Sequence, residues 1–287
     1  MAATLDLAES RARPLRGRLP HASSRRAASN ATRRLVRVAS VLVCIALWQA
    51  LVHMRVSLGI VTFSNVPSPI DVMQAFAAQL HSPKLPMHLA ASVLRVLGGF
   101  CSAAVTGVAL GLAIGRHRLI EDTLLPPLEM LRPIPAVAWI PLAILMFPSS
   151  ELSMVFITFI GALFPILLNT VHGVDAVDHR LIATARSLGT GPIALYTEVI
   201  VPGAAPAIFT GLAIGMGTAW FCLVTAEMIA GQYGIGYFTW ESYTLQNYAD
   251  IVVGMALIGT LGMGSSALVK RLGLLLTPWY RLRGEKR

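Results

Sequence analysis

Six long runs of apolar residues constrain this chain more than any other feature of its sequence. They extend over residues 38–53, 96–115, 124–147, 152–171, 208–226 and 251–269. A bilayer core of about 30 Å needs roughly 20 apolar residues in a helix. Because the runs are continuous rather than alternating, they indicate spanning helices and not the strands of a barrel. We therefore expect an all-α, polytopic membrane protein with six transmembrane helices.

The positive charge lies mainly at the two ends of the chain. Only 13% of all residues are charged and the net charge is +9, yet residues 1–37 alone hold nine arginines and residues 270–287 hold six lysines and arginines. The connections at 116–118 and 180–186 add four more arginines on the same predicted side. Because positive residues stay in the cytoplasm, we expect both termini there. Basic residues interleaved with aromatics are missing, which argues against a nucleic-acid partner.

These features predict three parts: a basic, unstructured tail at 1–37, a transmembrane domain at 38–269 and a basic C-terminal segment at 270–287. Ser24, Arg25 and Arg26 before an apolar run also resemble the start of a twin-arginine or organelle targeting signal. Five further spans follow, so the tail is better interpreted as lying against anionic lipid and fixing orientation.

No motif for catalysis by the chain itself is present in the sequence. None of the three lysines, at positions 84, 270 and 286, lies in a phosphate-binding G-x-x-x-x-G-K-[ST] loop, so ATP hydrolysis would need another subunit. H-E-x-x-H and G-x-S-x-G are also missing. The three cysteines lie inside apolar runs without metal-ligand spacing. We predict no catalytic residue, no metal and no cofactor.

The connection between the fourth and fifth runs, residues 172–207, has helical patterning that is unusual for a loop. Read as a helix ending at Gly189, its apolar side chains fall on one face, and its polar ones on another. A second helix at 192–201 would be closed by Pro202 and Gly203. Two short helices projecting from the membrane would form an element that a cytosolic partner can push. The predicted apolar face is Leu181, Ile182, Ala185 and Leu188, and the polar one is Arg180, Thr184 and Ser187.

This connection resembles the coupling motif E-A-A-x(3)-G-x(9)-I-x-L-P of permeases of ATP-binding-cassette importers. Ala183, Thr184 and Ala185 are followed by Gly189 and, nine residues on, by residues 199–202, Val-Ile-Val-Pro. Ala183 stands where the family has Glu, so the resemblance does not extend to a salt link from that Glu. Further matching segments are Val-Pro-Ser-Pro at 66–69, Leu-Arg-Pro-Ile-Pro at 131–135, Ala-Glu-Met at 226–228 and Gly-Ile-Gly at 234–236.

The resemblance covers about residues 60–280 and is nearest to permeases of nitrate, sulfonate and taurine importers. It implies the type I importer (MetI-like) permease fold in a bacterial inner membrane, with a cytosolic ATPase, an extracytoplasmic solute-binding protein and a second permease copy as partners. It also implies a small oxyanion substrate. The residues that it assigns to ATPase coupling are Ala183, Thr184, Ala185, Arg186, Gly189 and Pro202. The alternative is an amphipathic loop helix lying on the membrane surface.

The third run differs from the others because it contains five prolines and two charges. Prolines remove backbone hydrogen bonds, so a broken helix that lines a cavity is expected. Glu129 and Arg132 are three residues apart and would share a helix face. Arg132 either pairs with Glu129 near the inner interface or contacts an anion in the pathway. Glu227, at the outer end of the fifth span, is a further pathway candidate, with a structural or gate-lining role favoured.

Two further patterns bear on packing and on the outer surface. Glycines at 107, 111 and 115, and at 211 and 215, would allow close helix packing. Aromatic residues in the loop 231–250 suggest an interfacial belt, a cap on the outer opening or a contact for a binding protein. The alternatives to an importer permease are a secondary transporter driven by an ion gradient, which the missing inverted repeat argues against, and a membrane-embedded enzyme.

Overall fold

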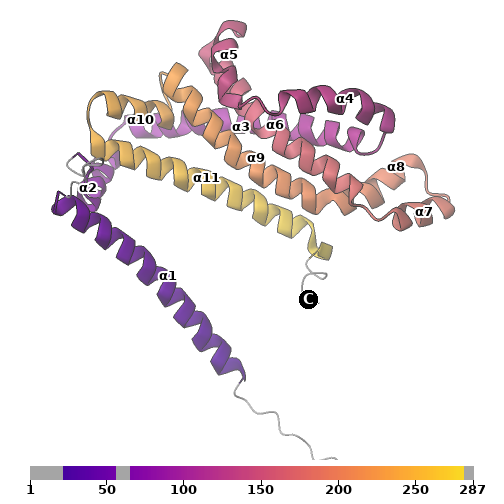
Figure 1. Cartoon of the computed structure of the whole chain (residues 1–287), viewed down its shortest axis with the longest axis horizontal. Coiled ribbons are helices and arrows are strands. Elements are labelled where there is room, and N and C mark those ends of the chain that lie inside the picture. The colour runs from indigo at the N-terminus through magenta and orange to yellow at the C-terminus, as the bar shows by residue number, and fades with distance from the viewer. Residues whose placement is uncertain (1–21, 56–64, 281–287) are drawn as a thin grey trace, which may run out of the picture. The chain divides into compact units, whose positions relative to one another are not determined.

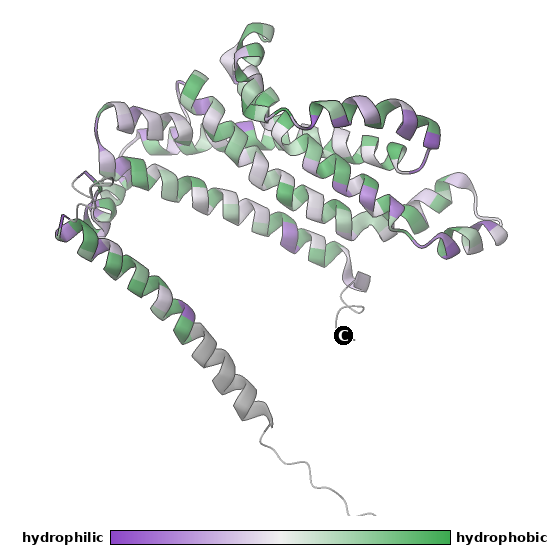
Figure 2. Ribbon diagram, viewed as in Figure 1, coloured by the Kyte–Doolittle hydropathy of each residue, from purple (hydrophilic) through white to green (hydrophobic). Residues whose placement is uncertain are grey.

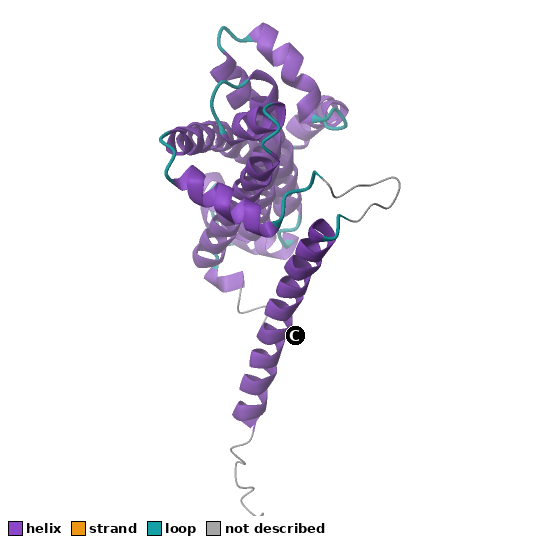
Figure 3. Ribbon diagram, turned by 90° about the vertical axis from the view of Figure 1, so that its left-hand side faces the viewer, coloured by secondary structure: helices purple, strands orange, loops and turns teal. Residues whose placement is uncertain are grey.

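The computed structural model describes residues 22–55 and 65–280, and every regular element in these ranges is a helix (Figures 1 and 3). Helix α1 belongs to one compact unit, and all later helices belong to a second unit that begins at Asn65. The elements are α1 (Ala22–His53), α2 (Pro69–Leu80), α3 (Lys84–Ile114), α4 (Arg118–Leu131), the 3₁₀ helix η1 (Ala136–Trp139), α5 (Ile140–Met146), α6 (Ser150–Asp175), α7 (His179–Ser187), α8 (Pro192–Ala194), the π-helix η2 (Leu195–Ile200), α9 (Val201–Ala230), α10 (Ile235–Thr244) and α11 (Tyr248–Leu276).

Within the described residues, five helices are long and apolar enough to cross a membrane, and a bent pair brings the number to six if it counts as one span. Figure 2 shows the apolar colouring along these helices. The expectation of an all-α membrane protein is therefore confirmed. The five are residues Leu35–His53 of α1, α3, α6, the stretch Pro192–Ala230 and α11, and the bent pair is α4 with the η1–α5 segment.

The third predicted span, 124–147, is broken rather than continuous. Helix α4 ends at Leu131, and the second limb starts at Ala136 and runs at 84° to the first. Pro133 and Pro135 lie in the break, where each lacks the N–H that would continue the helix. The expected break in this span is therefore confirmed.

Two boundaries differ from the expected ones. Helix α1 begins at Ala22, so residues 22–37, which were predicted as part of an unstructured tail, are helical. Helix α11 continues past residue 269 to Leu276. Residues 277–280 are also described, whereas residues 1–21 and 281–287 of the two basic segments lie outside the described ranges.

Helix α6 lies at the centre of the larger unit and packs against both α3 and α9. Both neighbours approach it through glycines. A Cβ atom at Gly111 of α3 would lie 2.6 Å from the Thr170 Cβ, and one at Gly215 of α9 would lie 2.8 Å from Ile166 Cγ1. The Thr170 hydroxyl donates to the carbonyl of Ile166 in its own helix, so it needs no partner across the interface. The expected close packing at the two glycine groups is confirmed, and Gly107, Gly115 and Gly211 make contacts of the same kind.

Smaller contacts hold the remaining helices on this centre. The Trp220 indole N–H of α9 donates to Ser265 Oγ of α11 at 2.9 Å. Helix α2 begins with a capping box in which Ser68 Oγ accepts from the Asp71 N–H, and the Asp71 carboxylate accepts from the Ser68 N–H. These hydrogen bonds hold the pKa of Asp71 below its usual value. The Ser-Pro of the 66–69 segment therefore serves as a helix start.

Candidate functional site

The connection between α6 and α9 folds into a helical hairpin, here called the lever, which consists of α7, α8 and η2 (residues 179–200). The Asp178 side chain caps α7 by accepting from the Arg180 N–H at 2.8 Å. At the other end, Gly189 has φ +79°, its N–H donates to Arg186 O at 3.0 Å, and the Thr190 N–H donates to Ala185 O at 3.1 Å. This is a Schellman ending, which favours glycine at the left-handed position. The predicted helix stop at Gly189 is confirmed.

The second half of the lever runs into the fifth span without a break. The Val201 N–H donates to Tyr196 O, five residues back, which widens the helix directly before Pro202. Proline lacks an N–H, and its ring crowds the carbonyl four residues earlier, so a wider turn at this place relieves the clash. The predicted closure of the second helix at Pro202 and Gly203 is therefore wrong. The stretch Pro192–Ala230 is one helical segment of 39 residues, about 58 Å at 1.5 Å per residue.

The lever packs against the bundle through an apolar cluster of its own. The buried residues of this cluster come from the end of α6, from η2 and from the first turns of α9. From α7, Ile182 and Ala185 pack against it. Burial of such side chains stabilises the hairpin in a fixed position relative to α6 and α9. The buried members are Val174, Leu195, Ile200, Ala204 and Ile208.

Large aliphatic side chains are nevertheless exposed on the lever, Leu188 and Ile193 beside the turn at its tip and Leu181 in the first turn of α7. Leu181, Leu188 and Ile193 are 59%, 81% and 79% exposed. Leu181, Ala185 and Leu188 share one side of the helix, as predicted, since they line one groove, whereas Ile182 packs inward against the bundle. A short helix that packs on one side only leaves such residues uncovered. Uncovered aliphatic side chains of this size are typical of a surface that meets another protein.

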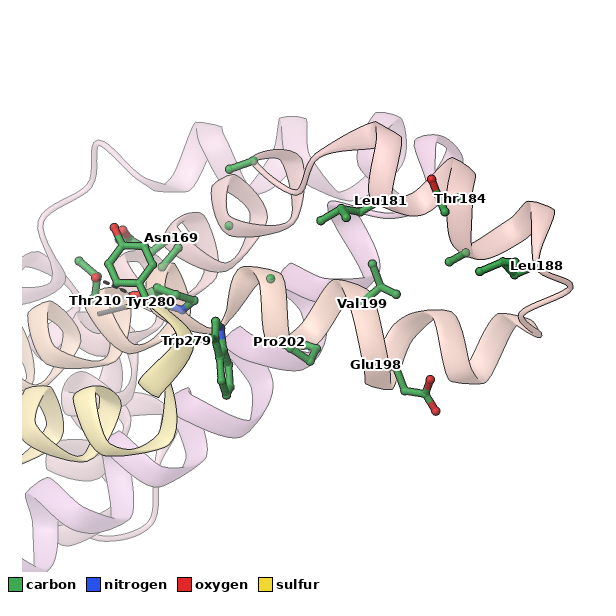
Figure 4. A pocket seen from close by; sticks show the side chains of 16 residues that line it. Asn169, Leu181, Thr184, Leu188, Glu198, Val199, Pro202, Thr210, Trp279 and Tyr280 are labelled. Atoms are coloured by element: carbon green, nitrogen blue, oxygen red, sulfur yellow. Dashed lines mark hydrogen bonds between the residues drawn. The ribbon is translucent and has the colours of Figure 1, made fainter. Parts of the chain in front are cut away.

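A groove of about 1120 Å³ lies between α7, the start of α9 and the end of the described C-terminal segment (Figure 4). Leu181, Thr184 and Leu188 line it from α7, and Trp279 and Tyr280 line it from the residues after α11. Its other walls are mainly apolar, and Glu198 is the one acidic side chain among the lining residues. The groove thus offers apolar contacts and a single carboxylate, which suits a protein segment better than a small polar solute.

The structure places the six predicted coupling residues on the lever and at the beginning of α9. Thr184, Ala185 and Pro202 line the groove, whereas Ala183 and Arg186 are exposed and do not line it. Gly189 forms the turn at the tip. At Ala183, where the family motif has Glu, the side chain is exposed and too short to reach a partner far from the helix.

At the opposite end of the bundle lies a second polar site, the arginine cluster, made of His88, Ser92, Arg95, Glu151 and Glu227. Its centre is Arg95 of α3, which is 4% exposed. Arg95 Nη1 donates to Glu227 Oε1 at 2.8 Å, while Nε and Nη2 donate to the two Glu151 oxygens at 2.7 and 2.5 Å. A guanidinium with two carboxylate partners is held in a fixed orientation.

Glu227, one of the predicted pathway residues, is completely buried in this cluster. Its Oε1 and Oε2 lie 2.8 and 2.9 Å from Ser92 Oγ, and Oε2 accepts from the Gly236 N–H at 2.9 Å. With both oxygens engaged inside the protein, this carboxylate does not line an open path. Its place favours the structural alternative.

The other two pathway candidates, Glu129 and Arg132, lie near the end of α4. Both are exposed. In the described part of the chain no ion pair joins them, so the expected pairing is wrong. The backbone is still helical at Arg132, whose N–H donates to Leu128 O at 3.1 Å, so the two exposed side chains extend into the surroundings without meeting.

Sequence reasoning missed the partners of Glu227. Arg95 is 132 positions from Glu227 and 56 from Glu151, and no local spacing connects them. One signal was present: His88, Ser92 and Arg95 repeat every three to four residues and so share one face of α3. Among the described residues, no group of three or more His, Cys, Asp or Glu is arranged to hold a metal ion.

Comparison with known proteins assigns the chain to one class of membrane protein. Residues 105–282 match the family model of the binding-protein-dependent transport system inner membrane component. The chain belongs to this family. It is 34% identical over 224 residues to the nitrate import permease protein NrtB of Synechocystis sp., which covers 75% of this chain and 82% of the relative.

Two further relatives carry different substrate names. The putative aliphatic sulfonates transport permease protein SsuC of Escherichia coli is 37% identical over 242 residues, 83% of this chain and 90% of the relative. The bicarbonate transport system permease protein CmpB of Synechococcus elongatus is 36% identical over 174 residues, 60% of this chain and 63% of the relative.

Membership of this family decides between the functions that the sequence left open. The chain is a multi-pass inner-membrane permease, the translocation subunit of an ATP-binding-cassette importer with the type I (MetI-like) fold. It is a transporter component and not an enzyme, nor is it a secondary transporter driven by an ion gradient. An importer of this class works with an ATPase and a solute-binding protein.

Proposed function

We propose that the lever is the part of this permease that docks on the cytosolic ATPase and receives its movement. The observation that carries the proposal is the set of exposed aliphatic side chains, Leu181, Leu188 and Ile193, on a hairpin that is firmly packed against the bundle. Docking would cover these side chains, which is favourable because apolar area leaves water. The positive residues of the lever, Arg180 and Arg186, support a cytoplasmic position for it and for both termini.

For the substrate we propose a small oxyanion, of the nitrate or sulfonate type. Support comes from the functions named for NrtB and SsuC and from Arg132, an exposed cation at the bend of the third span.

We also propose that two copies of this chain form the pore. Support for two copies comes from the importer family to which the chain belongs. Apolar side chains exposed on the spanning helices, such as Phe221 and Leu145, contact lipid equally well and do not bear on the number of copies. A purified importer whose measured mass accounts for only one permease chain would contradict this proposal.

Replacing Gly189 by valine tests the lever. A Cβ there meets no atom within 4 Å, but φ is +79°, a conformation that costs an L-residue about 1–2 kcal/mol and a β-branched one more. We expect normal amounts in the membrane and a fall in ATP-driven uptake of about 2- to 30-fold, the range for changes in coupling.

The matched control for this experiment is Gly191→Val. Gly191 lies in the same turn, has equally open surroundings and has φ −67° and ψ 162°, which valine adopts readily. Uptake into liposomes by the assembled importer, with the binding protein present, measures both variants. Equal uptake by the Gly189→Val and Gly191→Val variants would contradict the proposed role of the turn.

Substitution of Arg132 by glutamine tests the proposed contact with the anion. If Arg132 meets the oxyanion, loss of a charge-assisted hydrogen bond of about 1.5–3 kcal/mol lowers uptake roughly 10- to 100-fold. Arg118→Gln, at the first residue of α4, is the control because it removes an equal charge from the other end of that helix. Uptake rates of the two variants are compared as a function of binding-protein concentration. Unchanged uptake by Arg132→Gln would exclude the contact.

A further inference from the structure

The geometry points to Glu227, Arg95, Ser92 and His88 as positioning residues that hold α10 on α9 and on α3, with Arg95 tying α3 to Glu227 of α9. Movement of the lever would then reach α10 at the far end of the bundle through a single continuous helix. This inference rests on the proposed function of the lever and adds to it the element that receives the movement.

The first argument is that side chains of α3 and α9 bind four consecutive residues before and at the start of α10. Arg95 Nη1 donates to the Tyr233 carbonyl at 2.6 Å. The N–H groups of Gly234, Ile235 and Gly236 donate to His88 Nδ1 at 3.1 Å, Ser92 Oγ at 2.8 Å and Glu227 Oε2 at 2.9 Å. The first N–H groups of a helix have no hydrogen-bond partner within it, so these side chains act as acceptors for the N–H groups at the start of α10.

The second argument is the absence of space between this turn and α9. A Cβ atom at Gly234 would collide with the Glu227 carboxylate, and one at Gly236 would collide with the Val224 carbonyl. Gly234 also has φ +127°, which other residues rarely adopt. The Gly-Ile-Gly sequence therefore lets the backbone lie directly on α9. A turn pressed this closely against a helix cannot slide along it without first separating from it.

The third argument is the cost of that separation. Glu227 is completely buried, and a buried carboxylate is stable only while it is paired and hydrogen-bonded. If α10 left α9, the carboxylate would lose the Gly236 N–H, and Arg95 would lose the Tyr233 carbonyl. The second carboxylate on Arg95, from Glu151, is 63% exposed at the side chain and can be hydrated instead. The hydrogen bond from the Gly236 N–H to the completely buried Glu227 carboxylate is thus the one that water does not replace.

The fourth argument is the path from the lever. Pro192–Ala230 is one helical segment of 39 residues, and Glu227 lies in its last turn. A displacement at η2 is therefore transmitted along the backbone of α9 to Glu227. Because Glu227 holds α10, the outer loop and the lever move together.

The test compares Glu227→Gln with Glu241→Gln in the importer assembled with its ATPase and binding protein. Glu241 is the control because it lies on α10 itself and is outside the cluster. Hydrogen exchange measured by mass spectrometry reports on α10, and uptake per ATP hydrolysed reports on coupling. For Glu227→Gln we expect exchange at residues 231–245 to rise about tenfold or more, while exchange of the lever stays unchanged. Uptake per ATP should fall about tenfold, with ATP hydrolysis retained.

A second pair of variants covers the case in which Glu227→Gln does not fold. His88→Leu removes the acceptor for the Gly234 N–H, whereas His88→Asn keeps an acceptor oxygen at nearly the same distance from the backbone. Uptake per ATP should fall in His88→Leu and recover in His88→Asn.

Three results separate the possible failures. Faster exchange of α10 with unchanged uptake per ATP would overturn the inference, since a loose α10 would then transport normally. Equal losses of uptake and ATP hydrolysis in Glu227→Gln and His88→Leu would also overturn it, because the cluster would then only stabilise the fold. If Gly189→Val leaves uptake unchanged, the proposed function of the lever fails instead, whatever the cluster variants do.

Discussion

The Gly111→Leu variant is expected to lose most of its folded protein in the membrane. A Cβ at this position would lie 2.6 Å from the Thr170 Cβ and 2.9 Å from the Leu167 carbonyl of α6. The carbonyl belongs to a helix backbone and cannot turn aside, so α3 and α6 must separate. Overpacking of a tight core costs about 1–3 kcal/mol or more, and here the contact lies at the centre of the bundle. We expect a loss of stability of about 3 kcal/mol, measured as the midpoint of thermal aggregation in detergent.

Gly259→Leu provides the control for this variant. Gly259 is also a helix glycine in a spanning segment, but a Cβ there would meet nothing within 4 Å. Both substitutions add the same side chain and remove the same backbone freedom. Equal thermal midpoints for Gly111→Leu and Gly259→Leu would show that the close approach of α3 and α6 is not required for stability.

Removal of the guanidinium by Arg95→Met should have a comparable or larger effect. Methionine fills much of the volume of the arginine side chain but leaves the Glu227 carboxylate buried without a cation. Breaking a buried pair from one side costs about 3–5 kcal/mol. In Glu151→Gln the amide oxygen still accepts from Arg95, whose charge keeps Glu227 as its partner, so we expect a cost of less than about 1 kcal/mol at this largely exposed side chain. Thermal midpoints of the purified permease distinguish these outcomes.

The double variant Arg95→Met with Glu227→Gln identifies the cause. If the stranded charge accounts for the loss, the second substitution should restore about 2 kcal/mol or more, because neutral replacements of a buried pair are often well tolerated. A double variant less stable than Arg95→Met alone would mean that lost packing, and not an unpaired charge, destabilises the single variant.

Much of the fold follows from the sequence because the bilayer restricts the choices so strongly. The apolar runs predict the helices, and the glycine spacing predicts which parts of α3 and α9 pack closely, though not that α6 is the helix they meet. The end of α7 at Gly189 was predictable, because the Schellman turn depends on one local residue. The continuation of η2 through Pro202 was not, since proline ordinarily ends a helix and the π-turn that accommodates it has no signal in the sequence.

The arginine cluster shows the other limit of sequence reasoning. Glu227 was identified as unusual because it is a carboxylate at the end of an apolar span. Its role depended on which cation the fold brings to it, and Arg95 lies in a helix that is distant in the sequence. The apolar run of the second span begins at residue 96, so the polar face of α3 just before it was not included.

The shared backbone of the lever and the fifth span has a consequence for how such permeases can recombine. To exchange the lever for that of a relative, one junction can be placed between α6 and α7. At the C-terminal end of the lever no such loop exists, and the nearest turn lies at the tip, around Gly189 and Gly191. Any later junction falls within a continuous helix and must preserve the π-turn before Pro202. If the lever docks on the ATPase as proposed, gene exchange that gives the permease a different ATPase partner carries the fifth membrane helix with it.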